Sequence, residues 1–508
     1  MANHPRSKFR CNCRCLVGGR VVYDNQLSRR GGHLGIDTQY RSLDHFFPVI
    51  RGDENGEVKR PCVAIGWRVH GGRIRASAAS LSYAGPSVRP PRHFNKLLTL
   101  GSAASAAAAG YSLVLLAAAA RRATTPSLPA CSLSEPRLRL AALVPAHNEE
   151  ETIERSVRSL SDVDYPGDAW QVCVVADNCT DRTAEAARTV GAQVRERDDE
   201  NRLGKGHALD FGLQALMASE NPPDAVIVLD ADCEASPNLP RVVERELRGG
   251  ARAVQVSNTV SNPCASVYSA LRYAAFSAIN STRPRGRTQL GFSAGLLGTG
   301  MGFSRELLTK HPWTAYGLAE DSEYHLSLVV DGERVAFAGD AAVSSPMPTS
   351  FESAGTQQAR WEEGRWRLVR RWLPRLARAG IRRRDPACAA AAFELVVPPL
   401  SLHVAGTGGL FMLSALTLAR GATKLSLFAL SGQAVYVIGS LVIAQAPACA
   451  YRALLAAPLL MAWQLRIVVR TITGAGPRSW VRTRREPEGT GVGRPNPYTA
   501  VDRNEMTR

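Results

Sequence analysis

The chain has 508 residues, enough for one large domain with membrane segments or for two soluble domains. Its formal net charge of +17 comes almost entirely from arginine, since only six of the 62 basic residues are lysines. The arginines concentrate beside apolar stretches and in the termini, so we expect membrane lipids, and not nucleic acid, as partners. Eleven mostly isolated cysteines exclude a secreted disulfide framework and favour a reducing, cytosolic environment.

The first segment in chain order, residues 1–95, is basic and broken by glycines, and we expect a disordered extension. Residues 97–120 then form a stretch of 24 uncharged residues, closed by Arg121 and Arg122. That length predicts a transmembrane helix. The alternative is an alanine-rich soluble helix.

From residue 138 onward, short apolar runs alternate with helical patterns. This alternation predicts an α/β domain with a mostly parallel sheet that helices cover on both faces. Such sheets bind ligands beyond the carboxyl ends of their strands, which is where the polar motifs of this segment fall. The predicted strands are Leu140–Val144, Gln171–Ala176 and Ala225–Leu229.

The third predicted strand is followed directly by Asp230 and Asp232. Residues two apart in an extended chain point the same way, so both carboxylates can face one cavity. Two hard oxygen ligands suit Mg²⁺ or Mn²⁺, which also bind diphosphate oxygens. A solvated loop is the alternative interpretation of this pair.

Three further polar positions lie near strand ends or helix starts. Asp177 closes the second predicted strand and is a candidate nucleotide contact, although Asp181 beside it is expected to cap a helix. Lys205 stands between two glycines, which let the backbone come close to a ligand. It is either a candidate diphosphate contact or part of a turn before the next helix. Glu149 sits at a helix start, where a carboxylate is also locally stabilised.

The C-terminal third contains two more long uncharged stretches, residues 395–419 and 425–446, which we expect to cross the membrane as a tight hairpin. Pro398 and Pro399 should kink the first of them. Residues 451–472 carry three arginines and are expected to lie along the membrane surface, followed by a basic disordered tail over residues 473–508. The basic tail places the segment from 123 to 390 in the cytosol, with the chain spanning the cell (inner) membrane several times.

Five motifs occur in one order: PAHNEE (Pro145–Glu150), ADNCTD (Ala176–Asp181), LDAD (Leu229–Asp232), AED (Ala319–Asp321) and QQARW (Gln357–Trp361). Together they resemble the membrane-bound glycosyltransferases of family 2, which include the synthases of cellulose, chitin, hyaluronan and poly-N-acetylglucosamine. The resemblance implies a GT-A (nucleotide-diphospho-sugar transferase) domain over residues 138–375, continued by an interfacial helix to residue 384. It also implies a UDP-sugar donor and a cytosolic active site.

The resemblance assigns roles to individual residues. Asp321 is the implied general base, which takes the proton of the acceptor hydroxyl, although it can equally cap a helix over residues 322–329. The implied donor contacts are Pro145, Ala146, Glu149, Asp177, Lys205, Asp230, Gln357 and Arg360. The implied acceptor contacts are Glu320, Gly300, Met301 and Trp361.

The expected function is inverting transfer of a hexose or N-acetylhexosamine from the donor to a growing polysaccharide. QQARW favours this polymer product. The first alternative is transfer of a single sugar to a lipid carrier, either a polyprenyl phosphate or a glycolipid. The second alternative is a catalytically silent membrane scaffold on the same fold.

Overall fold

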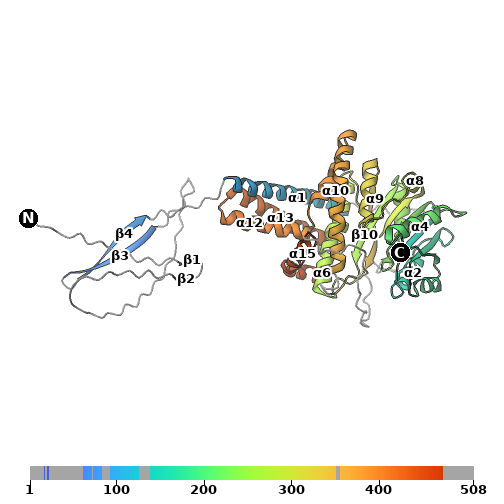
Figure 1. The fold of residues 1–508 in the computed structure, drawn as a ribbon, viewed down its shortest axis with the longest axis horizontal. Helices are drawn as coiled ribbons and strands as arrows, with labels where there is room; N and C mark the ends of the chain where they lie inside the picture. The colour runs from blue at the N-terminus through green and yellow to red at the C-terminus, as the bar shows by residue number, and fades with distance from the viewer. Residues whose placement is uncertain are drawn as a thin grey trace, which may run out of the picture. The chain divides into compact units, whose positions relative to one another are not determined.

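This computed structural model describes residues 93–121, 138–349 and 364–467 in full, together with the backbone of a few further helical and strand segments. The chain divides into two compact units, Met1–Val88 and Arg89–Arg508. The second unit contains the α/β domain and every helix among the described residues (Figure 1).

The first unit contains two antiparallel strand pairs. β1 (Leu16–Val17) pairs with β2 (Arg20–Val21), and β3 (Pro61–His70) pairs with β4 (Arg73–Ser82) (Figure 1). The prediction of a wholly disordered segment over residues 1–95 is therefore wrong for these strands. The sequence did contain a signal, because Val63, Ile65, Trp67 and Val69 alternate with small or polar residues as in a strand.

The α/β domain is built on one mixed sheet of eight strands in the order β7-β6-β5-β8-β11-β10-β12-β9. The strands β5, β6, β7 and β8 are mutually parallel, and β10 is parallel to β12. β11 runs antiparallel to both its neighbours. The bounds are β5 Leu140–Ala146, β6 Trp170–Asp177, β7 Gln193–Arg197, β8 Ala225–Val228, β9 Glu234–Ala235, β10 Ala253–Val260, β11 Met301–Ser304 and β12 Val335–Ser345.

Helices cover both faces of this sheet, as predicted. The alternating side chains of β5 enter two separate hydrophobic clusters, Leu140, Ala142 and Val144 in one and Ala141 and Leu143 in the other. The first cluster is completed by α2 (Ile153–Ser161), α3 (Thr183–Thr189) and α5 (Leu239–Arg248). The second is completed by α4 (Lys205–Met217), α8 (Arg305–Lys310) and α9 (Glu320–Asp331).

Two long apolar helices, α1 (Arg92–Thr124) and α13 (Arg420–Ile443), pack along each other through small residues. Ala106 and Ala109 meet Ala429, and the hydroxyls of Ser102 and Ser426 share a hydrogen bond of 2.8 Å. Small residues let the backbones approach closely, as in membrane bundles. Both helices are long and apolar enough to span a membrane, and large apolar side chains such as Leu97 and Val435 remain exposed on them.

The predicted span over residues 395–419 is broken. α11 (Pro386–Val396) and α12 (Leu400–Leu416) meet at an angle of 69°. Pro398 and Pro399 stand in the break, so the predicted kink is confirmed, and whether the bent pair crosses the membrane as one broken span stays a prediction. α12 and α13 pack together as the predicted tight hairpin, but its turn lies at residues 417–419 and not at 420–424, because α13 already begins at Arg420 with Ala419 as its N-cap.

The last described segment comprises α14 (Ala448–Ala453), a 3₁₀ turn (Leu454–Ala456) and α15 (Ala457–Ile472). By length and composition Ala448–Ile467 is a third candidate span, and the bent pair α11–α12 would be a fourth. The surface location expected for residues 451–472 remains a prediction.

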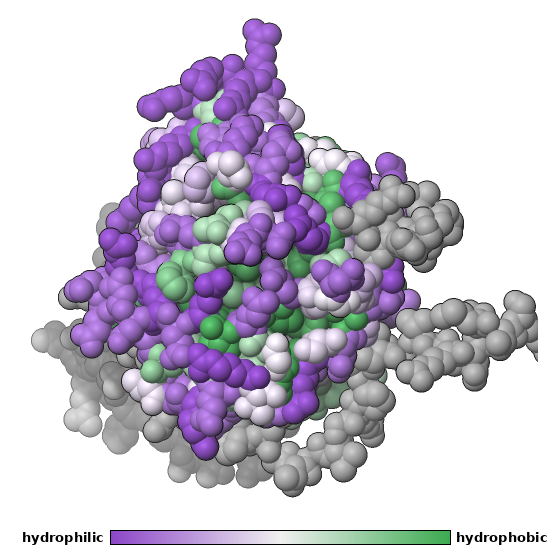
Figure 2. All heavy atoms as spheres, turned by 90° about the vertical axis from the view of Figure 1, so that its right-hand side faces the viewer, coloured by the Kyte–Doolittle hydropathy of each residue, from purple (hydrophilic) through white to green (hydrophobic). Residues whose placement is uncertain are grey.

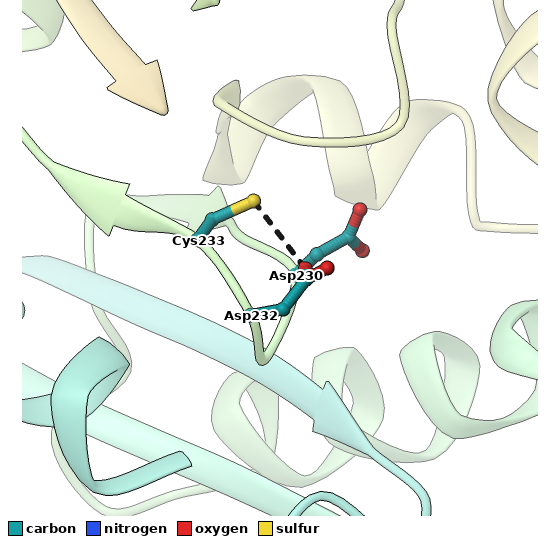
Figure 3. A group of neighbouring side chains, drawn as sticks. All are labelled: Asp230, Asp232 and Cys233. Atoms are coloured by element: carbon teal, nitrogen blue, oxygen red, sulfur yellow. Dashed lines mark hydrogen bonds between the residues drawn. The ribbon is translucent and has the colours of Figure 1, made fainter. Parts of the chain in front are cut away.

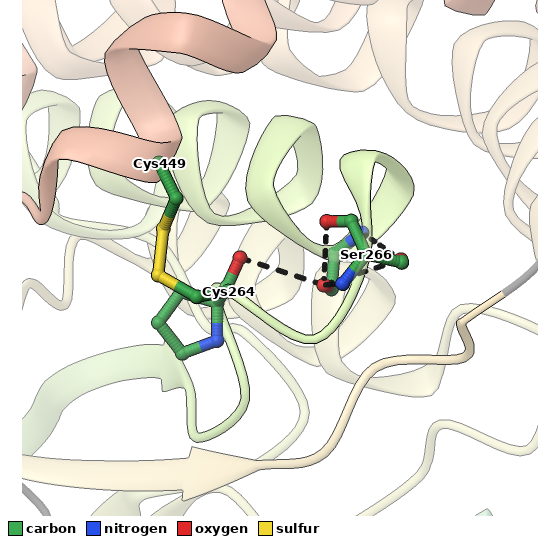
Figure 4. Close-up of a disulfide and its surroundings, with 5 residues drawn as sticks. Cys264, Ser266 and Cys449 are labelled. Carbon is green, nitrogen blue, oxygen red and sulfur yellow. Dashed lines mark hydrogen bonds between the residues drawn. A yellow bond between two sulfur atoms is a disulfide. The ribbon is translucent and has the colours of Figure 1, made fainter.

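Cys264 and Cys449 form a disulfide between the loop after β10 and the start of α14 (Figure 4). The expectation of isolated, unpaired cysteines is therefore wrong for this pair. The two residues are 185 positions apart in sequence, so only the tertiary arrangement brings them together. Disulfides are uncommon in a reducing cytosol, so this pair runs against the environment that the cysteine pattern favoured.

Candidate functional site

A cavity of about 2070 Å³ opens at the carboxyl ends of β5, β6 and β8. It gathers most of the residues that the motifs pointed to, although they come from distant parts of the sequence. These are Pro145, Ala146, Glu149, Asp177, Lys205, Asp230, Asp232, Glu320 and Asp321. The position agrees with the general rule for ligands on parallel strands.

Asp230 and Asp232 converge through a turn, not through an extended strand. β8 already ends at Val228, and the amide of Cys233 donates to the carbonyl of Asp230 at 3.1 Å. The ligand atoms of Asp230, Asp232 and Cys233 lie within 4.8 Å of one another (Figure 3). Two carboxylates at this spacing fit a hard divalent cation.

Cys233 is better described as a support for Asp232 than as a metal ligand. Its thiol donates to Asp232 Oδ1 at 3.6 Å and accepts from the hydroxyl of Thr299 at 3.5 Å. Burial, and then the charges of the two aspartates, raise the pKa of this thiol well above its usual value. A sulfur ligand is also softer than Mg²⁺ or Mn²⁺ prefers, whereas the carboxylate that it supports is a hard oxygen ligand.

Lys205 is the cation of the site. Its Nζ lies 2.5 Å from Asp230 Oδ1 and 3.6 Å from Glu320 Oε1, and it donates to the carbonyl of Gly298 at 2.6 Å. Burial alone would lower the pKa of Lys205, but the two carboxylates outweigh burial and raise it. Lys205 therefore stays charged and can meet a diphosphate.

Gly206, beside it, has a packing role that the sequence did not reveal. A Cβ at this position would lie 2.2 Å from the carbonyl oxygen of Ala315. The glycine lets α4 approach residues 315–316. The close backbone approach that the sequence predicted at this position is therefore made to another part of the protein and not to a ligand.

Asp321 lies in the first turn of α9, whose N-cap is Ala319. The alternative that Asp321 caps this helix is therefore wrong. Burial, and then the charge of the neighbouring Glu320, raise the pKa of Asp321 to about 7, while the charge of Lys205 opposes them. A carboxylate with a pKa near neutrality can accept a proton from a hydroxyl during a reaction and release it afterwards.

At the other end of the site, Asp177 is almost fully buried and is held by a residue that sequence analysis missed. Arg197 Nη1 donates to Asp177 Oδ1 at 2.5 Å from the neighbouring strand β7. The backbone carbonyl of Asp177 hydrogen-bonds His147 Nδ1 at 2.7 Å. Asp181 accepts from the amide of Thr183 at 3.0 Å at the start of α3, as expected for a structural residue.

The acceptor role expected for Gly300 and Met301 is wrong. Met301 begins β11 with no exposed surface and belongs to the hydrophobic core. Gly300 is also buried, and a Cβ there would lie 2.5 Å from Val256 Cγ2. The residues of this loop that line the cavity are Gly298 and Thr299.

The QQARW motif lies at the start of α10 (Gly355–Arg383). The side chains of Gln357, Arg360 and Trp361 fall outside the described residues. Their assigned contacts with donor and acceptor therefore remain predictions.

The cavity continues from Asp321 to the apolar helices. Its far part is lined by residues of α11, α12, α13 and α15 and of the segments that join them: Glu394, Leu395, Pro399, Leu400, Val404, Val437, Leu460 and Met461. Glu394 is a partly buried carboxylate there, held by Arg287 Nη1 at 2.5 Å and by the Tyr111 hydroxyl at 3.1 Å. Its charge is balanced within the protein, which lowers the cost of its position beside the apolar helices.

Comparison with known proteins agrees with this geometry. Residues 136–364 match the sequence model described as "Glycosyltransferase like family 2". Those residues form a family 2 glycosyltransferase domain. It has a GT-A-like fold, with the mixed, mostly parallel sheet described above.

Among curated relatives, beta-monoglucosyldiacylglycerol synthase of Nostoc sp. is 28% identical over 232 residues, covering 44% of this chain and 48% of the relative. The 4,4'-diaponeurosporenoate glycosyltransferase of Staphylococcus haemolyticus is 33% identical over 99 residues, covering 19% of this chain and 24% of the relative. The chain thus spans about half the length of the first of these curated relatives.

Among solved structures, the mannosyltransferase PcManGT from Pyrobaculum calidifontis, in complex with GDP-Man and Mn²⁺, has a TM-score of 0.43 and 21% identity. The match covers 68% of this chain and 98% of that chain.

Proposed function

We propose that the protein is an inverting glycosyltransferase that moves one sugar from a nucleotide-sugar, expected to be a UDP-sugar, to a membrane lipid. The observation that carries the proposal is the continuous cavity. It joins Asp321 to the apolar side chains of α12, α13 and α15, two of which belong to candidate membrane spans. An acceptor whose tail lies among those helices can place its hydroxyl at the carboxylate.

The proposed chemistry follows from the charges of the site. Asp177 and Arg197 lie at the expected nucleotide end, and Lys205 faces the diphosphate. Asp230 and Asp232 would hold a divalent cation, Mg²⁺ or Mn²⁺, which offsets charge on the departing nucleoside diphosphate. Asp321 takes the proton from the acceptor hydroxyl as its oxygen attacks the anomeric carbon from the face opposite the leaving group.

Two further observations support a lipid acceptor. The names of the Nostoc and Staphylococcus relatives state lipid-like products or substrates, a glucosyldiacylglycerol and a diaponeurosporenoate. The face of the α/β domain that is directed away from α1, α12 and α13 is largely hydrophilic (Figure 2). This is consistent with a domain that lies in water beside the membrane. We place that domain on the cytosolic side of the cell membrane, where nucleotide-sugars are made.

A growing polysaccharide is the second candidate acceptor. It is favoured by QQARW at the start of α10, a motif that the family associates with chain-building enzymes. The few candidate spans, three or four among the described residues, leave little room for a polymer path.

A matched pair of substitutions on α13 tests the lipid path. Val437 lines the cavity, whereas Val435, two positions earlier, is 54% exposed on the outside of the helix. Val437→Trp should fill the apolar end of the cavity and lower transfer to lipid by about 5- to 150-fold, the effect expected of roughly 1–3 kcal/mol of steric conflict. Donor hydrolysis by water should persist.

The measurement follows labelled sugar into lipid extracts, with release of free nucleotide measured in parallel. Val435→Trp makes the same change in size outside the cavity and should stay near wild type. Equal transfer by both variants would exclude the apolar end of the cavity as the acceptor path.

A further inference from the structure

The outer face of α10 carries an unusual density of positive charge. Between residues 364 and 384 there are nine arginines and no acidic residue. Eight of them are exposed, seven within α10 and Arg384 just beyond its end, and we call these the arginine face: Arg367, Arg370, Arg371, Arg375, Arg378, Arg382, Arg383 and Arg384.

The opposite face of α10 is fixed by packing. Leu368, Trp372 and Leu376 are buried against Leu326 and Val329 of α9. The orientation of the helix about its axis is therefore set by the core, and the arginines are directed outward. This arrangement leaves the arginine face available to a partner.

The charges on this face are only partly neutralised by ion pairs within the protein. Arg371 pairs with Glu323 of α9, and Asp385, just beyond the helix, is occupied by Arg334 at 2.7 Å. Within the part of the chain that the structure describes, Arg370, Arg378, Arg382 and Arg384 have no ion-pair partner. The face therefore keeps a large excess of positive charge.

Two large apolar side chains accompany the arginines. Trp366 is 45% exposed and Ile381 is 82% exposed. At 100° per residue both lie within about a tenth of a turn of Arg370, so they share its side of the helix. A helix that presents arginines together with an exposed tryptophan and isoleucine fits the boundary between lipid headgroups and acyl chains.

The placement of α10 agrees with such a boundary. In Figure 1 the helix runs across the direction of α1 and α13 and stands between them and the sheet, and it contacts α9, α11 and α15. If α1 and α13 cross a membrane, a helix that runs across them at the end where the catalytic domain begins would lie along its surface.

We infer that the arginine face binds anionic phospholipid headgroups, and that this contact supports catalysis by holding α9. The coupling runs through one element, since Glu323, which Arg371 pairs, is two residues from Asp321 in α9. The binding of headgroups is independent of the function proposed above, whereas the effect of that binding on the rate of sugar transfer rests on the proposed function. The partner is the bilayer itself, since phosphate groups of its lipids match the arginines in charge.

The test uses the full-length protein in nanodiscs of phosphatidylcholine alone or with phosphatidylglycerol. The variant replaces the four arginines without an ion-pair partner: Arg370→Gln, Arg378→Gln, Arg382→Gln and Arg384→Gln. Backbone hydrogen exchange over residues 364–384 should slow in the anionic discs for wild type, by about tenfold or more, and not for the variant. Sugar transfer should rise several-fold with phosphatidylglycerol in wild type only.

The matched control removes the same charge from the catalytic domain: Arg158→Gln, Arg188→Gln, Arg195→Gln and Arg241→Gln, all surface residues away from α10. It should respond to phosphatidylglycerol as wild type does. Hydrogen exchange over α10 that is the same in both discs for wild type would overturn the lipid contact. Slowed exchange without any sugar transfer would keep the contact and instead refute the proposed function.

Discussion

Asp321→Asn is expected to lower the rate of transfer by about 10²–10⁴-fold while leaving donor binding nearly unchanged. The reason is that the proposed role of this carboxylate is to accept the proton of the acceptor, while the proposed nucleotide contacts Asp177 and Arg197 stay in place. The measurement is transfer rate at saturating donor, with calorimetry of UDP-sugar binding beside it. A rate within a few-fold of wild type would mean that Asp321 is not the base.

The same carboxylate predicts the pH dependence. Its pKa is raised to about 7, and only its deprotonated form accepts a proton, so activity is lost as the pH falls through about 7. Glu320→Gln is the informative comparison, because it removes the charge of Glu320, which follows burial as a cause of the shift. The midpoint of the pH dependence of activity should lie at lower pH in Glu320→Gln than in wild type. A midpoint that stays in place in Glu320→Gln would contradict the assignment of the titration to Asp321.

Asp232→Ala should abolish metal-dependent donor binding and reduce transfer by orders of magnitude. Removing one of two carboxylates leaves a divalent cation with too few oxygen ligands beside the diphosphate. Titration of UDP binding with and without Mg²⁺ or Mn²⁺ measures this directly. Cys233→Ala provides the control, since it removes the thiol and keeps both carboxylates, and it should retain the metal dependence.

If Cys233→Ala instead lost metal binding to the same extent as Asp232→Ala, the sulfur would be a ligand and the cation a softer one. Donor binding that is equally strong with and without metal in wild type would remove the metal from the account altogether.

Much of the site could be predicted because short local patterns determine it. A buried strand followed by an acidic turn places Asp177, Asp230 and Asp232 at one edge of a parallel sheet wherever the rest of the chain goes. Lys205 was identified from the glycines on either side of it, and Asp321 from the AED motif.

Features that depend on contacts between distant segments could not be predicted. Arg197 reaches Asp177 only because β7 pairs with β6, and Cys264 meets Cys449 only after the helices have packed. Met301 was assigned to the acceptor because its loop, GTGM (Gly298–Met301), resembles the acceptor loop of the family. In the structure β11 pairs with β8 and β10, which places the side chain of Met301 in the core. The break between α11 and α12 was foreseen from its prolines, while the angle of 69° between the two helices needed the three-dimensional arrangement.

The central claim, transfer of one sugar to a membrane lipid, is tested most directly by the product itself. The purified full-length protein in lipid nanodiscs is incubated with a panel of radiolabelled nucleotide-sugars, and the product is partitioned into organic solvent and sized over time. The account predicts a single labelled glycolipid from one donor, extractable and constant in size. A water-soluble product that lengthens with time would contradict it in favour of a polysaccharide synthase.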